Sequence, residues 1–211
     1  MIKTATQKAL KTTGLEKAGL KVEYIKEKKN IFKRIKNDVN TILNTGFNPK
    51  KNKIRISEKG LSLASFHEIG HAINYNYSKT GRLLQKLRKP CMALAALLGT
   101  FTAMTKTSKP KDGKKLTKFQ KIKNYIRENV GKLTFAATLP VLIEEAMATK
   151  HGNNLARQFL PPELAQKVVK MNKMAYITYL ITAFEVSAGA YAGKKVKDAL
   201  VEKKEAKSLV A

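Results

Sequence analysis

The stretch that decides the fold is Phe-His-Glu-Ile-Gly-His, residues 66–71 of the chain. It contains the pattern HExxH, with His67 and His71 four residues apart. On an α-helix, residues four apart lie one turn above each other, so both imidazoles can reach one zinc ion. In a chain with so few histidines the pattern would arise by chance only about 0.002 times. We therefore predict that this segment is a helix carrying a metal site.

The residues around the two histidines predict an amphipathic helix over 58–79. Phe66, Ile69 and Ile73 recur at helical spacing and form the face that we expect to be buried. The histidines lie on an adjacent face. Gly70 keeps the surroundings of the motif small, so that another element can pack closely against this helix.

A short strand is predicted immediately before this helix. Residues 53–57 alternate in polarity and place Ile54 and Ile56 on one face. Ser57 is the predicted N-cap of the following helix, and residues 46–49 favour a turn. Such a strand, at the edge of a small sheet, is suited to pairing with an extended peptide substrate.

A catalytic zinc ion needs a third protein ligand and one position open to water. The histidine that metzincins have six residues after the second motif histidine is absent, because that position is Tyr77. The remaining candidates are downstream carboxylates. Glu144 and Glu145 follow an apolar segment and begin a helical stretch, and either fits the role. His151 is a further alternative ligand.

At these residues the chain resembles the gluzincin metalloproteases, in which a second helix after HExxH carries a glutamate ligand. That glutamate often opens a Glu-x-x-Ala-[Asp/Ser/Asn] pattern, which residues 145–149 follow except for Thr149 at the last position. The resemblance implies Glu145 as the third ligand and Glu144 as a supporting residue. Over residues 50–155 the order of elements also resembles membrane-associated families: the CAAX prenyl proteases, the heat-shock membrane proteases and the neutral zinc metallopeptidases.

The motif and the resemblance together predict a zinc metallopeptidase acting on a protein or peptide substrate. Zn2+ would be held by His67, His71 and Glu145. Glu68 would act as the general base, taking a proton from water and delivering it to the leaving amine. Three side chains are candidate donors to the oxyanion: Tyr75, Tyr77 and His151.

The charge of the chain predicts a second kind of partner. The sequence holds 42 Lys+Arg against 15 Asp+Glu, a net charge of +27, and most of the basic residues are lysine. Lysine is a hydrated point charge that suits attraction to an anionic membrane surface better than sequence-specific reading of nucleic acid. Stacking on single strands is also disfavoured, because aromatic residues make up only 7% and tryptophan is absent. The alternative function is therefore a cationic membrane- or nucleic-acid-binding protein whose HExxH site is structural or inactive.

Three apolar stretches, residues 91–105, 133–143 and 174–193, leave the environment of the protein open. A membrane-spanning helix needs about 20 apolar residues, so only the third stretch, with Glu185 as its single charge, is long enough. The stretches are either core helices of a soluble zinc protease or are buried in a membrane. The expected location is thus membrane-associated or cytoplasmic. No cleaved secretory signal is expected, because the lysines of the N-terminus are followed by no apolar region.

The predicted fold is mainly α, a helical bundle with a small β element next to the HExxH helix, which is similar to the zincins. Residues 1–45 are expected to form a basic helical segment, with an amphipathic helix near 29–44. Residues 46–193 form the predicted metalloprotease-like domain with its three apolar helices. Residues 194–211 form a charged C-terminal tail.

Overall fold

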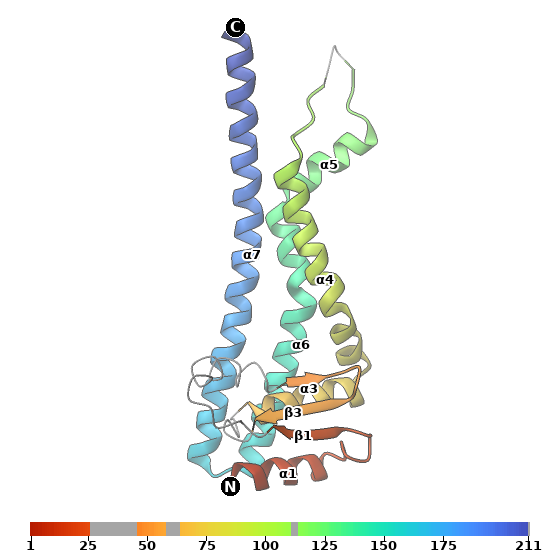
Figure 1. The fold of residues 1–211 in the computed structure, drawn as a ribbon, viewed down its shortest axis with the longest axis vertical. Coiled ribbons are helices and arrows are strands. Elements are labelled where there is room, and N and C mark those ends of the chain that lie inside the picture. Colours follow the sequence, from red (N-terminus) through yellow and green to blue (C-terminus); the bar gives the residue numbers. More distant parts are fainter. Residues whose placement is uncertain (26–45, 58–63, 111–113, 211) are drawn as a thin grey trace. The chain divides into compact units, whose positions relative to one another are not determined.

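The computed structural model describes residues 1–25, 46–57, 64–110 and 114–210, and these residues are mainly helical with one small sheet. This confirms the predicted fold class. The described helices are α1 (Ile2–Thr12), α3 (Ser65–Tyr77), α4 (Lys79–Met104), α5 (Lys118–Glu128), α6 (Val130–Phe159) and α7 (Pro162–Val210) (Figure 1). The strands are β1 (Lys21–Ile25), β2 (Gly46–Asn48) and β3 (Lys53–Ser57).

The sheet has the order β1-β3-β2, so β3 is its central strand. Strand β1 runs parallel to β3, and β2 runs antiparallel to it with Phe47 opposite Ile54. The strand at 53–57 is confirmed, but its predicted position at the edge of the sheet is wrong. The prediction of a turn over 46–49 is also wrong in part, since residues 46–48 are strand and the turn follows them.

Of the predicted basic helical segment 1–45, the structure describes residues 1–25, and these contain a strand as well as a helix. Helix α1 buries Ala5, Ala9 and Leu10 on one face, as expected for an amphipathic helix. Strand β1 follows because Val22 and Tyr24 alternate with charged residues and pack against the core. The helix predicted near 29–44 lies outside the described residues.

The chain forms two compact units. Unit 1 comprises Met1–Lys86 and Val141–Tyr179. Within it, α3 packs against β2, β3 and α1 (Figure 1). Its hydrophobic core includes Ile54 and Ile56 from the sheet and Phe66 and Ile69 from α3. The face of the HExxH helix that was predicted to be buried is therefore buried.

Helix α3 is shorter than the predicted helix over 58–79. It begins at Ser65 and ends at Tyr77, and residues 58–63 lie outside the described part of the chain. Its N-cap is Ala64, which makes no side-chain cap hydrogen bond, so the prediction of Ser57 as the cap is wrong. The helix is held by the burial of its apolar face and not by a cap.

Unit 2 comprises Leu87–Pro140 and Leu180–Ala211, and contains α5 and parts of α4, α6 and α7. The three apolar stretches lie in α4, α6 and α7, as predicted for helices. Helix α7 is continuous from Pro162 to Val210, so the third stretch and the charged tail belong to one helix. In the described residues, no helix combines the length and the apolar character needed to cross a membrane.

Candidate metal centre

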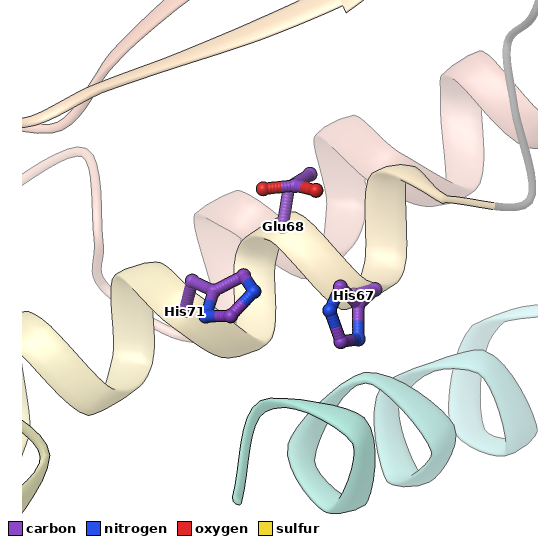
Figure 2. Close-up of side chains that lie close together, drawn as sticks. All are labelled: His67, Glu68 and His71. Atoms are coloured by element: carbon purple, nitrogen blue, oxygen red, sulfur yellow. The ribbon is translucent and has the colours of Figure 1, made fainter. Parts of the chain in front are cut away.

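Helix α3 presents His67 and His71 on one face and buries both. The two imidazole rings lie edge to face with their centroids 4.6 Å apart. Figure 2 shows both rings pointing toward α6, whereas Glu68 points to the other side of α3. The ligand atoms of these three residues nevertheless lie within 4.8 Å of one another. The spacing of the motif therefore gathers two nitrogens and one carboxylate, as the sequence predicted.

Helix α6 brings a buried glutamate to the two histidines. Glu145 Oε2 lies 3.1 Å from His67 Nε2 and 3.5 Å from His71 Nε2. One carboxylate oxygen thus faces both Nε2 atoms at once. These three atoms come from two helices, and Glu145 lies more than seventy residues after either histidine in sequence.

Glu144 lies on the other side of the His71 ring. Its Oε1 accepts a hydrogen bond from His71 Nδ1 at 2.8 Å. The same oxygen accepts from Asn74 Nδ2 at 3.0 Å and from Gln85 Nε2 at 2.8 Å. Because an ionised carboxylate only accepts hydrogen bonds, Nδ1 of His71 carries the proton and Nε2 is the atom left to bind a metal.

Two glycines allow α3 and α6 to approach closely enough for this arrangement. A Cβ on Gly70 would lie 2.1 Å from the carbonyl oxygen of Ala148. A Cβ on Gly152 would lie 2.7 Å from the carbonyl oxygen of Phe66. The glycine of the motif was expected to permit close packing, and it does. Gly152 was missed, although it lies seven residues after Glu145 and so shares its helix face.

Glu68 is hydrogen-bonded to the sheet. Its Oε2 accepts a hydrogen bond from the backbone N–H of Phe47 in β2 at 2.7 Å. Burial raises the pKa of the Glu68 carboxyl, against the opposing effects of His71 and His67. A raised pKa brings a carboxylate closer to the range that suits proton transfer near neutral pH. The contact with Phe47 could not be expected from the sequence, because it uses only the backbone of a segment predicted as a turn.

The carboxylates make the centre electronegative. Burial lowers the pKa of His71, but the hydrogen bonds to Glu144 and Glu145 outweigh burial and raise it to about 10. Burial likewise raises the pKa of Glu144, but the hydrogen bond from His71 and those from two amides hold it below its usual value. Three carboxylates around two imidazoles therefore favour an added positive charge. A metal ion would compete with protons for this position.

The other predicted residues lie less centrally. Thr149 Oγ1 is 3.4 Å from His67 Nδ1, at the position where the gluzincin pattern has an acidic or polar residue. His151 is half-buried, and burial and Lys150 lower its pKa. The Tyr77 hydroxyl donates to the carbonyl of Thr13 at 3.0 Å and is engaged there. Tyr75 packs its ring against Phe47.

The donor set fits zinc. A tetrahedral zinc ion with bonds of about 2.0–2.2 Å holds its ligand atoms roughly 3.3–3.6 Å apart. The distances from Glu145 Oε2 to the two Nε2 atoms, 3.1 and 3.5 Å, are close to this range. Two imidazoles and one carboxylate form a common ligand set for catalytic zinc. A histidine ligand usually donates a hydrogen bond from the ring nitrogen that does not bind the metal, and His71 does so from Nδ1.

Comparison with known proteins adds no family to this picture. No protein-family model, no curated protein and no solved structure matches the chain. The resemblance to gluzincins therefore stays a prediction made from the motif. The case for a function rests on the chemistry of the centre in unit 1.

Proposed function

We propose that the protein is a zinc-dependent metallopeptidase. The observation that carries this proposal is the convergence of His67 Nε2, His71 Nε2 and Glu145 Oε2 beside the carboxylate of Glu68. This is the arrangement that zinc-dependent hydrolysis of a peptide bond uses: three ligands for one metal ion and one acid–base group that is not a ligand.

Each residue has a distinct task in this proposal. His67, His71 and Glu145 would hold the zinc ion, which when bound activates water and polarises the carbonyl of the scissile bond. Glu68 accepts the proton of the attacking water on a carboxylate oxygen and then delivers it to the leaving amine. Burial raises its pKa, which makes the carboxylate a better acceptor for the proton of the attacking water. Glu144 acts as a positioning residue that fixes the orientation of His71.

Strand β2 is the part of the sheet that borders the centre. Its Phe47 N–H reaches Glu68, and within the described part of the chain β2 pairs with β3 alone. An extended peptide binds readily to an unpaired sheet edge through main-chain hydrogen bonds. The proposed position of a peptide substrate is therefore the outer edge of β2. This replaces β3, the strand for which the sequence predicted substrate pairing.

The test combines metal content with proteolysis of fluorescein-labelled casein. Wild-type protein should hold about one zinc ion per chain by elemental analysis, and His67→Ala and Glu145→Ala should lose it. Glu68→Gln should keep the zinc and lose at least about a thousandfold in turnover, because the proton acceptor is gone while the ligands remain. Glu163→Gln, at an exposed glutamate in α7, is the matched control and should behave like wild type.

Two results would count against the proposal. Substantial proteolysis by Glu68→Gln would exclude that residue as the general base. Absence of zinc from every form after metal-replete refolding would exclude a zinc enzyme. The second result would favour the alternative, a cationic binding protein in which the centre is only structural.

A further inference from the structure

Helix α5 in unit 2 carries two polar side chains inward and three large apolar or aromatic side chains outward. Arg127 is completely buried, and Asn124 is half-buried. In contrast, Phe119 is 71% exposed, Ile122 58% and Tyr125 61%. The three exposed side chains are spaced three residues apart and so form a row along one side of the helix. This distribution is the reverse of the one expected for a helix that packs on a core.

The orientation of α5 is fixed by hydrogen bonds from its inner face. The side-chain amide of Asn124 accepts from the N–H of Ser108 and donates to its carbonyl, both at 2.9 Å. Arg127 donates to the carbonyl oxygens of Thr102 and Thr105 and to the carboxylate of Asp198. Rotation of α5 to bury its apolar row would leave a buried guanidinium without these partners, which is costly. These hydrogen bonds therefore keep the apolar row facing outward.

Lysines surround the apolar row. The residues that precede and flank it on the chain include four exposed lysines: Lys114, Lys115, Lys118 and Lys121. The single acidic residue of α5 is Glu128, at its last position. A capping box between Thr117 and Gln120 fixes the first turn of the helix, so Lys118 is held next to Phe119.

We propose that α5 docks on a membrane surface that contains anionic lipid. Phe119, Ile122 and Tyr125 enter the boundary between headgroups and acyl chains, while the lysines contact the headgroups. Short amphipathic helices with aromatic and aliphatic side chains on one face and lysines beside them bind membranes in this way. Each lysine near such a surface adds to the attraction. The inference goes beyond the proposed peptidase activity and does not depend on it.

The charge and the composition of this surface favour lipid over other occupants. A second copy of the chain would also carry +27, so repulsion opposes docking between copies. Single-stranded nucleic acid binds by stacking of bases on aromatic rings, and the centre of this row is the aliphatic Ile122. A lipid surface uses both the aliphatic centre of the row and the lysines around it.

The absence of tryptophan from the chain allows a direct test of insertion. Phe119→Trp places the single tryptophan of the chain in the row, and Leu97→Trp is the matched control. Leu97 is 66% exposed, also lies in unit 2, and belongs to a stretch without lysines. With phosphatidylcholine vesicles holding about 30 mol% phosphatidylglycerol, we expect a blue shift for Phe119→Trp only. No shift, or an equal shift for Leu97→Trp, would overturn the proposal.

Sedimentation with the same vesicles measures the contribution of the row to binding. Phe119→Ser combined with Ile122→Ser should weaken binding at least about tenfold, and Leu94→Ser combined with Leu97→Ser should not. Lys118→Ala combined with Lys121→Ala should weaken binding about 30-fold. Glu68→Gln should bind as wild type does, which separates this proposal from the enzymatic one. The proposal would be overturned if the variant without the apolar row bound vesicles as tightly as wild type. It would also be overturned if the protein bound single-stranded RNA but not vesicles.

Discussion

Glu144 and Glu145 are neighbours in sequence but serve opposite sides of one imidazole. Successive residues of an α-helix are rotated by about 100°, so their carboxylates reach different atoms. Glu145 Oε2 faces the Nε2 atoms of both histidines, and Glu144 Oε1 accepts the proton of His71 Nδ1. The pair therefore combines a candidate ligand with the group that orients another ligand.

Glu144→Ala is expected to lower zinc affinity about 10- to 100-fold, because His71 loses the acceptor that fixes its orientation. The loss should be smaller in Glu144→Gln, which keeps an acceptor oxygen for His71 and for the amides of Asn74 and Gln85. Competition with a chromogenic chelator measures both affinities. If Glu144→Ala removed zinc completely while Glu145→Ala retained it, the assignment of ligand and positioning residue would be reversed.

The HExxH part of the centre was predictable because it depends only on the period of one helix. The choice between Glu144 and Glu145 was not predictable from spacing, because a rotation of one residue on α6 exchanges them. Gln85 was missed for a related reason. Its amide reaches Glu144 because the start of α4 lies beside the centre after the chain turns at the end of α3. No local sequence pattern predicts that turn.

The close contact between α3 and α6 depends on two glycines at matching positions. Gly70 packs on the backbone of Ala148, and Gly152 packs on the backbone of Phe66 and His67. The neighbour is backbone in both cases, so it cannot move aside as a flexible side chain would. The distance between the two helices, and with it the distance from Glu145 to the histidines, is set by these residues.

Gly152→Ala should therefore destabilise the protein by about 1–3 kcal/mol, despite the better helix propensity of alanine. It should also weaken zinc binding. Gly189→Ala is the control, because nothing lies within 4 Å of the added Cβ; it should stabilise by about 0.5–1 kcal/mol. Urea unfolding measures both changes. Equal stabilisation by the two substitutions would show that the helices can separate without cost.

The strands show the limit of pattern analysis at the scale of elements. Alternation predicted β3 correctly, since Ile54 and Ile56 face one side. It could not show that β3 is central, because the two partners come from segments before it in the chain. Strand β1 was hidden in a lysine-rich segment, and β2 has only three residues. Pairing between distant segments decides such short strands, and their own composition does not.

Some charges of the protein attract one another, although most repel. The dependence of stability on acidic pH should reveal the attractive interactions. Burial raises the pKa of Asp198, but the hydrogen bonds from Lys194 and Arg127 outweigh it and hold the pKa below its usual value. A depressed pKa in the folded state adds stability above the unfolded pKa of about 3.9. That stability is lost as the pH falls through the lower, folded pKa.

Asp198→Asn should thus lower the free energy of unfolding at neutral pH by about 2–3 kcal/mol, since it leaves the buried Arg127 without its counterion. Below about pH 4 the difference from wild type should shrink. Urea unfolding at several pH values measures this dependence. Glu202→Gln, at an exposed residue one turn further along α7, is the control. A constant difference at all pH values would contradict the pairing of Asp198.

Repulsion should dominate the response of the whole molecule to salt. Only 15 acidic residues are available to 42 basic ones, so most basic residues cannot each pair with a carboxylate. Raising NaCl from roughly 10 to 100 mM shortens the screening length from about 30 to about 10 Å. Screening then removes more repulsion than attraction, because the Arg127 pair is shielded from solvent. We expect the free energy of unfolding in urea to rise by about 1–2 kcal/mol. Sodium gluconate at equal ionic strength should give the same rise, whereas a fall in stability would mean that exposed ion pairs outweigh the repulsion.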